Sequence, residues 1–323
     1  MKNKKFMWLG ALAALAVMVS GSAYFWSVRE KPISSPLAGK SSSVQRWNKA
    51  RALNRAECDK FEKIFDLYGH PSVSEQNFNA SLNYSDYIDI CNTDYLVRYS
   101  YKTKTPLWTV EIVNRGETLL ETRSDNFTPD PRVDTRVQAR NADYLNSGFD
   151  RGHIAAAGNM GGHEGEAMQE SFYFTNIVPQ VGPNMNRGIW RQLETYARKQ
   201  AEVSSQAIVY TGVIFEENSP LLKGIKVPHS LYKIIYSPQH HSSQSFLMPN
   251  VQILTRRSKL AEGNPEYPQT TSAQSIECES GCTIASFQTK REKIESLAGI
   301  KLLNNTSQTL VEATPSARSR RKP

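Results

Sequence analysis

The chain has 323 residues, of which 39% are hydrophobic, and its formal net charge is +8 at pH 7. This length suits one large domain with tails, and the moderate hydrophobic content excludes a bundle of membrane-spanning helices. The positive charge favours polyanionic partners such as nucleic acid or anionic lipid, although half of the excess comes from Arg318, Arg320, Arg321 and Lys322 near the C-terminal end.

The N-terminal segment, residues 1–28, has the pattern of an export signal. Three lysines within the first five residues precede an apolar run, and residues 20–23 form a small-residue cleavage site. The uncharged stretch 6–28 is also long enough to remain as a membrane anchor, which needs about 20 residues. We therefore expect an exported protein, periplasmic or secreted, whose leader is either cleaved as a signal peptide or retained as an anchor.

Three further parts of the chain follow from composition and patterning. Residues 29–46 are rich in proline and serine, which indicates a linker. Residues 47–304 carry the periodic patterns of a folded domain, and the informative motifs lie between 88 and 300. Residues 305–323 end in a basic run and are predicted to be a disordered tail.

Within the predicted domain, strand patterns outnumber helical ones. The strand patterns cover 95–101, 107–113, 206–214, 230–236 and 244–254. The helical patterns cover 47–67, 164–170 and 189–200. The first two strands form a hairpin with a turn over 102–106. Runs of strands with interspersed helices predict an α+β fold with a mainly antiparallel central sheet flanked by helices.

The four cysteines, Cys58, Cys91, Cys278 and Cys282, suit a disulfide framework in an oxidising compartment, because their number is even. A zinc site is disfavoured, since neither pair has the usual two-residue spacing and no histidine lies at ligand intervals. Of the three connectivities, the sequence favours Cys58–Cys91 with Cys278–Cys282, because the second pair closes one small loop.

Residues 148–153 contain a candidate general base. Hydrolysis of a phosphodiester requires a base that activates water, cations that neutralise the developing charge, and help for the leaving oxygen. His153 suits the first task, since neutral imidazole, with a usual pKa of about 6.5, accepts a proton near neutral pH. Two glycines allow a tight backbone path around Asp150 and Arg151. For the other five histidines we prefer a structural role.

Asn186 is the candidate metal ligand, because an amide oxygen is a hard neutral donor that Mg²⁺ accepts while keeping several waters. The alternative is a helix N-cap, since Asn186 precedes a predicted helix. Glu194 lies eight residues later, about two helical turns away and close to one face, so it can hold a metal-bound water. Its alternative is a solvated carboxylate paired with Arg191 or Arg198. The absence of a carboxylate cluster in the sequence favours a single ion over a two-metal site.

Three ordered motifs resemble those of the DNA/RNA non-specific endonucleases, a family that includes secreted bacterial nucleases of the Serratia type and mitochondrial endonuclease G. The motifs are Asp150-Arg151-Gly152-His153 with the preceding 141–149, then 172–180, and then Asn186-Arg187-Gly188-Ile189-Trp190 with Leu193-Glu194. The weaker similarity extends from residue 91 to about residue 300. Because the three motifs occur in order and near the expected spacing, the resemblance is specific.

The resemblance implies a ββα-metal active site and a Mg²⁺-dependent endonuclease, with Mn²⁺ as an alternative ion, that cuts DNA and RNA to 5′-phosphate products. It implies that His153 is the base and that Asn186 is the only direct protein ligand of the metal. The other implied roles are phosphate contact by Arg123 and Arg151, orientation of His153 or the phosphate by Asn176, organisation of the loop by Asp150, and binding of a metal water by Glu194.

The chain departs from the family pattern between Gln180 and Trp190, where it is one residue longer and holds a second asparagine, Asn184. Asn184 therefore remains an alternative ligand to Asn186. Two other functions also remain open. One is a phosphodiesterase that acts on small nucleotides, and the other is an inactive relative that only binds nucleic acid.

Overall fold

The computed structural model describes residues 55–68, 71–73, 87–116, 125–161, 165–255, 275–278, 281–302 and 311–312. The predicted export segment 1–28, the predicted linker 29–46 and Arg123 lie outside these residues, as does most of the predicted tail. In the described part of the chain, no helix combines the length and the apolar composition that crossing a membrane requires.

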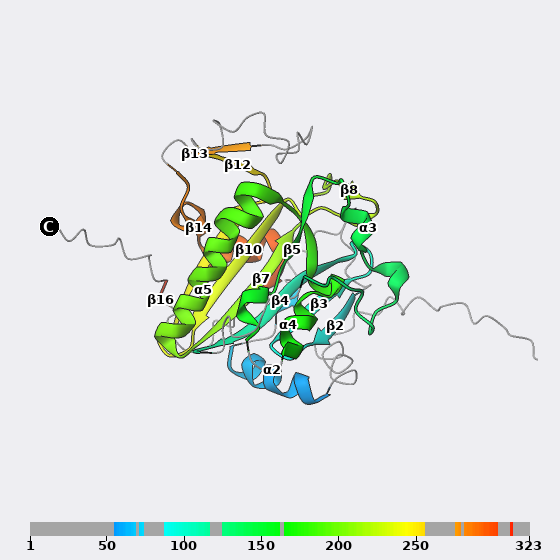
Figure 1. Ribbon diagram of the computed structural model, residues 1–323. Helices are drawn as coiled ribbons and strands as arrows, with labels where there is room; N and C mark the ends of the chain where they lie inside the picture. The colour runs from blue at the N-terminus through cyan, green and yellow to red at the C-terminus, as the bar shows by residue number, and fades with distance from the viewer. Residues whose placement is uncertain are drawn as a thin grey trace, which may run out of the picture. The chain divides into compact units, whose positions relative to one another are not determined.

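The central feature is a sheet of eight strands, seven of which form one antiparallel path (Figure 1). In spatial order they are β14 (Gln288–Thr289), β11 (Ser242–Pro249), β10 (Ser230–Ser237), β7 (Gln206–Ile214), β4 (Thr105–Asn114), β3 (Tyr95–Ser100) and β2 (Tyr87–Cys91). The eighth strand, β16 (Val311–Glu312), pairs in parallel with β11. The predicted α+β fold with a mainly antiparallel sheet is confirmed.

Helices and short two-stranded ribbons surround this sheet. The α-helices are α2 (Arg55–Tyr68), α3 (Asn141–Tyr144), α4 (Glu166–Ser171), α5 (Arg191–Ser204) and α7 (Arg291–Ala298). The 3-10 turns are η1 (Thr135–Val137), η2 (Ala157–Asn159), η4 (Phe174–Asn176) and η6 (Ile284–Phe287), and η5 (Gly182–Trp190) is a π-helix. The ribbons are β1 (Ser72–Val73) with β15 (Ile300–Lys301), β5 (Phe149–His153) with β6 (Ile177–Val181), β8 (Leu221–Leu222) with β9 (Ile225–Lys226), and β12 (Gln252–Thr255) with β13 (Ser275–Cys278).

Most predicted strands match the structure closely, and β7 has the predicted bounds. The prediction of one strand over 244–254 is wrong, because the chain bends between β11 and β12. The side chain of Asn250 holds this bend: its amide donates to the carbonyls of Pro179 and Pro228 and accepts from the Val181 N–H. The first hairpin also differs, since β4 begins at Thr105 within the expected turn.

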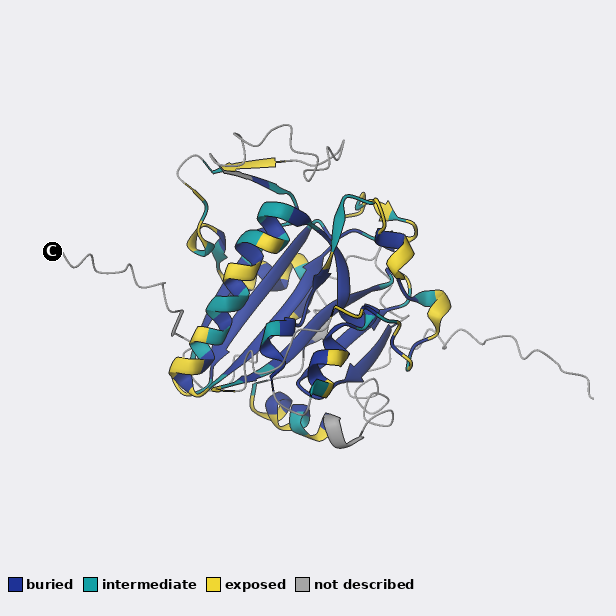
Figure 2. Cartoon of the chain, in the orientation of Figure 1, coloured by how far each residue is buried: buried dark blue, intermediate teal, exposed yellow. Residues whose placement is uncertain are grey.

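Helix α5 covers one face of the central sheet and packs against β7 and β10 (Figure 1). Its buried residues, Leu193, Ala197, Ala201 and Ser204, recur at spacings of three and four, so they form one stripe on the helix. Small alanines in that stripe allow close approach of the helix to the strands. The opposite side of α5 is exposed, whereas the strands beneath it are buried (Figure 2).

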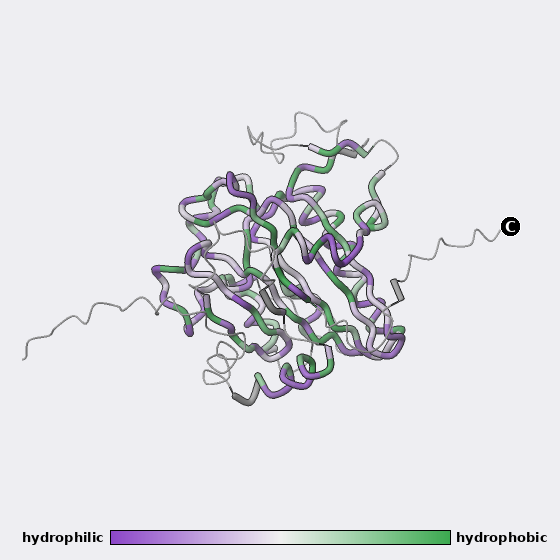
Figure 3. The backbone as a smooth tube through the Cα atoms, turned by 180° about the vertical axis from the view of Figure 1, so that it is seen from behind, coloured by the Kyte–Doolittle hydropathy of each residue, from purple (hydrophilic) through white to green (hydrophobic). Residues whose placement is uncertain are grey.

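The β5–β6 ribbon lies where two hydrophobic clusters meet. Ile154 and Val178 belong to the cluster that includes α5 and the centre of the sheet. Ala155 and Ile177 belong to a second cluster, built on β2, β3 and several aromatic residues. Hydrophobic and hydrophilic residues follow one another along the backbone in the view from behind (Figure 3). Packing on both sides therefore fixes the ribbon firmly in the fold.

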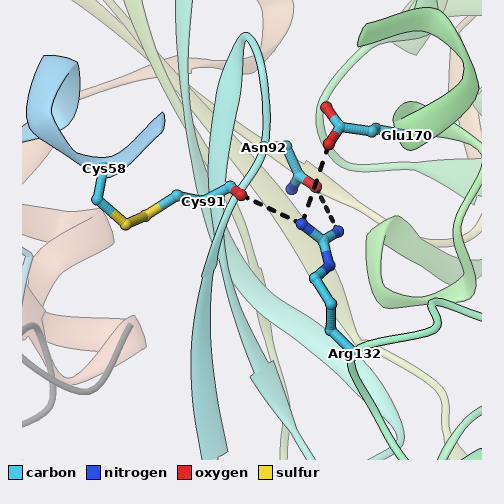
Figure 4. The surroundings of a disulfide bond; sticks show 5 residues. All are labelled: Cys58, Cys91, Asn92, Arg132 and Glu170. Carbon is cyan, nitrogen blue, oxygen red and sulfur yellow. Dashed lines mark hydrogen bonds and ion pairs between the residues drawn. A yellow bond between two sulfur atoms is a disulfide. The ribbon is translucent and has the colours of Figure 1, made fainter. Parts of the chain in front are cut away.

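Both predicted disulfides, Cys58–Cys91 and Cys278–Cys282, are present in the structure, so the predicted pairing is confirmed. The first is buried and joins α2 to the end of β2. Arg132 lies beside it and donates to the Cys91 carbonyl at 3.2 Å and to Asn92 Oδ1 at 2.6 Å, with Glu170 Oε1 3.9 Å from its Nη1 (Figure 4). Burial raises the pKa of the Glu170 carboxyl, against the effect of this guanidinium.

We expect the two disulfides to differ in their contribution to stability. The closed loops span sequence separations of 33 and 4 residues. Chain-entropy arguments then give about 4 kcal/mol for Cys58–Cys91 and about 2 kcal/mol for Cys278–Cys282. Thermal unfolding should therefore show a larger drop in Tm for Cys58→Ser, whose site is also fully buried, than for Cys282→Ser. An equal or reversed order would contradict this ranking.

Candidate active site

The candidate base, His153, ends strand β5. The sequence suggested a tight loop over 148–153, but Phe149–His153 pairs with β6 along its whole length, and His153 lies opposite Ile177. Ile177 and Val178 of β6, and Ile154 and Ala155 just after β5, anchor the ribbon in the two clusters. Side chains alternate along a strand, so Arg151 and His153 point to one face of the ribbon and Asp150 and Gly152 to the other.

Aromatic rings surround the imidazole of His153, which is 8% exposed. The Phe172 ring meets it edge-on at 4.7 Å, and the Phe127 ring lies 5.4 Å away, both measured between ring centroids. Phe127 also supports Arg151, whose guanidinium carbon lies 4.0 Å from the ring centroid. Arg151 Nη1 donates to Asn141 Oδ1 at 2.6 Å and its side chain is exposed. One phenylalanine thus holds an imidazole and an exposed cation side by side.

Asn176 holds the backbone that follows His153. Its Oδ1 accepts from the Ala155 N–H at 2.8 Å, and its Nδ2 donates to the carbonyls of Ala155 and Ser171. The Asn176 carbonyl also accepts from the Ile154 N–H. Because the side chain is completely buried and bonded to the main chain, its geometry suits the orientation of His153 rather than contact with a phosphate.

Asp150 joins the ribbon to the turn that carries the candidate metal ligand. Its Oδ2 accepts from Asn186 Nδ2 at 3.0 Å and lies 3.1 Å from Arg187 Nε. Gly182 leaves room for this group, since a Cβ there would come within 2.9 Å of Asp150 Oδ1. A carboxylate can only accept, so it fixes which end of the Asn186 amide faces it.

The segment between Gln180 and Trp190 forms the π-helix η5, which leads directly into α5. A π-helix holds one more residue per turn than an α-helix, and such turns are frequent at functional sites. Asn186 lies inside this helical turn, so the N-cap interpretation is wrong. Asn184 lies in the same turn, but its Nδ2 is buried and finds no hydrogen-bond partner among the described residues.

Glu194 lies in the first turn of α5 and is half-buried. Arg198, one turn further on, interacts with its charge. The Arg198 guanidinium donates to Asn159 Oδ1 at 3.2 Å and to Thr195 Oγ1 at 2.9 Å. Burial lowers the pKa of Arg198, and the charges of Glu194 and Glu111 act in the opposite direction. Of the two arginines suggested from the sequence, Arg198 thus interacts electrostatically with Glu194.

The arrangement around Asn186 fits a divalent cation held mainly by water. Since Asp150 takes the amide nitrogen, the Oδ1 of Asn186 is left as a hard donor, and it accepts no hydrogen bond from any described residue. Mg²⁺ prefers oxygen ligands and retains several waters. Within the described ranges, no group of three or more His, Cys, Asp or Glu side chains gathers around one point. These residues therefore offer such an ion the Oδ1 atom of Asn186 and the carboxylate of Glu194 on the following helix.

Gly152 is required by a close approach across the ribbon. A Cβ at this position would lie 1.7 Å from Gln180 Oε1, so no other residue fits without displacing the Gln180 side chain. The Gln180 amide also reaches Met185 Sδ at 3.6 Å. Gln180 thus packs between the strand that ends in His153 and the turn that contains Asn186.

The sequence analysis did not identify Glu111 and Lys233, which lie fully buried on β4 and β10. Glu111 is bonded to the segment that follows His153, and Lys233 lies beside Trp190. A signal was present, because each is a charged residue in the interior of an otherwise apolar or alternating strand. Arg198 was named only as an alternative partner of Glu194. Arg123, in contrast, cannot be placed, since it lies outside the described residues.

Comparison with known proteins shows which family this chain resembles. The family model of the DNA/RNA non-specific endonucleases matches residues 74–309. Nuclease EXOG, mitochondrial, of Danio rerio is 36% identical over 180 residues, which cover 50% of this chain and 52% of the relative. Endonuclease G, mitochondrial, of Caenorhabditis elegans is 31% identical over 183 residues, which cover 50% and 58%. The chain thus spans about half the length of these relatives.

A solved structure is also similar. It contains endonuclease G in complex with its inhibitor EndoGI, and it matches with a TM-score of 0.52 and 28% sequence identity over 66% of this chain and 84% of that chain. The similarity supports the assignment of the β5–β6 ribbon, with η5 and α5, to the ββα-metal nuclease fold.

Proposed function

Because the chain belongs to the DNA/RNA non-specific endonuclease family, we propose that it is a metal-dependent nuclease that hydrolyses phosphodiester bonds of DNA and RNA with little dependence on sequence. One observation carries the proposal. A single ribbon and the helical turn that follows it bear His153, Arg151 and Asn186, and Asp150 joins the two elements directly. This unit supplies a base, an exposed cation and a hard oxygen donor.

His153 acts as the general base in this proposal. Its imidazole takes a proton from the attacking water, and the rings of Phe127 and Phe172 keep it in one orientation. Asn176 contributes by fixing the backbone after His153. Arg151 is exposed on the same face of the ribbon, so it can contact a phosphate oxygen and neutralise charge as the bond breaks. Arg123 is proposed for a similar contact.

Asn186 Oδ1 would hold the divalent cation, Mg²⁺ or Mn²⁺, and Glu194 would bind one of its waters. When bound, the ion would supply positive charge to the phosphate and the leaving oxygen. Asp150 keeps the Asn186 amide in the required orientation through its hydrogen bond to Nδ2. Departure of the 3′ oxygen would leave 5′-phosphate products.

Export is part of the same proposal. A nuclease that ignores sequence would damage nucleic acid in the cell that makes it, so action outside the cytosol avoids this harm. The pattern of residues 1–28 and the two disulfides support an oxidising destination, periplasmic or secreted, with residues 6–28 either removed or kept as an anchor.

The proposal predicts that the purified protein degrades supercoiled plasmid and structured RNA in Mg²⁺ and that EDTA abolishes both activities. Restoring excess Mg²⁺ or Mn²⁺ should recover cleavage. End-labelling of the products should reveal 5′-phosphates. A small dinucleotide serves as the control substrate: rapid hydrolysis of the dinucleotide without plasmid cleavage would favour a phosphodiesterase, and binding without any cleavage would favour an inactive relative.

A further inference from the structure

A buried ion pair lies next to the candidate active site. Glu111 on β4 and Lys233 on β10 form an ion pair with 3.6 Å between Oε1 and Nζ, and both side chains are 0% exposed. Thr211 on β7, the strand between them, accepts from Lys233 Nζ at 2.7 Å and donates to Glu111 Oε1 at 3.3 Å. The pair therefore spans three neighbouring strands at the centre of the sheet.

Stability alone does not explain such a pair. Removing two charges from water costs several kcal/mol per ion, and apolar residues of similar volume often replace buried ion pairs without loss of stability. The surrounding sheet is rich in buried apolar residues. The role of this buried ion pair must therefore be inferred from the groups to which it is bonded.

These bonds reach three elements of the candidate site. Glu111 Oε2 accepts from the Ala156 N–H at 3.1 Å and from Asn159 Nδ2 at 2.6 Å, and both donors lie in the segment that follows His153. Asn159 in turn accepts from Arg198 on α5, the residue beside Glu194.

The third element is the turn that carries Asn186. The Lys233 ammonium lies 5.1 Å from the centroid of the Trp190 ring, and Trp190 is the last residue of η5. Each half of the ion pair is therefore anchored in the sheet and contacts a different part of the site.

We propose that Glu111 and Lys233 are positioning residues, which fix the His153 segment, the Asn186 turn and helix α5 relative to one another. This proposal rests on the proposed nuclease function. Neither residue needs to touch substrate. The rigid sheet would set the distance between base and metal ligand, and small errors in such distances are costly, since a misplacement of about 1 Å can reduce the rate about 100-fold.

The test compares Glu111→Gln with a matched control, Asp89→Asn. Asp89 and Arg98 form another buried ion pair of the same sheet, at 2.7 Å, and the Arg98 guanidinium packs against the rings of Tyr87 and Trp108. Both variants exchange one carboxylate for an amide of the same shape, so both should lower Tm. Glu111→Gln should also lower kcat on plasmid about 10–100-fold with little change in KM, whereas Asp89→Asn should leave kcat unchanged.

Two further measurements keep the test decisive. Asn159→Ala removes the link to α5 together with one hydrogen bond to Glu111, but it keeps both charges of the ion pair. It should therefore lower kcat even if Glu111→Gln folds poorly. Hydrogen exchange should become faster over 154–159 in Glu111→Gln and stay unchanged there in Asp89→Asn, which tests the positioning role independently of nuclease activity. The inference is overturned if Glu111→Gln and Asn159→Ala, folded at the assay temperature, keep wild-type kcat while the wild type cleaves plasmid, or if exchange over 154–159 does not change.

Discussion

Replacing His153 with alanine should lower kcat on plasmid about 10²–10⁴-fold, the usual contribution of a general base, with little change in substrate binding. The reason is that the imidazole alone accepts the proton of the attacking water in the proposed mechanism. Alanine also leaves space between Phe127 and Phe172, so stability must be measured separately. Steady-state kinetics with plasmid and RNA, at a temperature where both proteins are folded, would check the result.

The matched control for this variant is His229→Ala. His229 is half-exposed, and its imidazole bonds to Ser230 and lies 3.2 Å from Glu216. It should keep wild-type turnover. The wild-type rate should rise with pH as the base loses its proton, and His153→Ala should lose this rise. Near-normal turnover of His153→Ala, or an unchanged pH–rate profile, would remove His153 from the mechanism.

Replacing Asn186 with alanine should raise the Mg²⁺ concentration for half-maximal activity more than about tenfold, since the change removes the only proposed protein ligand of the ion. Asn184→Ala is the matched control in the same turn. Its amide nitrogen has no hydrogen-bond partner among the described residues, so the loss should be mild. Calorimetric titration of both variants with Mg²⁺ would measure affinity without relying on turnover.

A larger loss of Mg²⁺ affinity in Asn184→Ala than in Asn186→Ala would identify Asn184 as the metal ligand in η5. A third variant separates the loss of the ligand oxygen from the loss of its orientation. Asp150→Ala removes the acceptor that orients the Asn186 amide but keeps its oxygen. This variant should therefore weaken Mg²⁺ binding less than Asn186→Ala does.

Most of the long central strands of this protein could be read from local periodicity. β7 coincides with an alternating segment of the sequence, and the 95–113 hairpin was expected within a few residues. Alternation determines which side of a strand is buried, so neighbouring residues contain this information. The bend at Asn250 was not predictable, because its cause is a set of bonds to residues 22 and 71 positions away.

The sequence by itself determined the kinds of reactive groups and their order along the chain, since both depend only on residue type and position. It favoured one disulfide pairing of three, and the structure confirmed it. Only the tertiary structure decided that 149–153 is a strand, that Asp150 orients Asn186 and that Glu111 and Lys233 lie under the site. The Asp150–Asn186 contact joins residues 36 positions apart, and Glu111 is 45 positions from Ala156. Such contacts depend on how the sheet brings distant segments together, which no local pattern encodes.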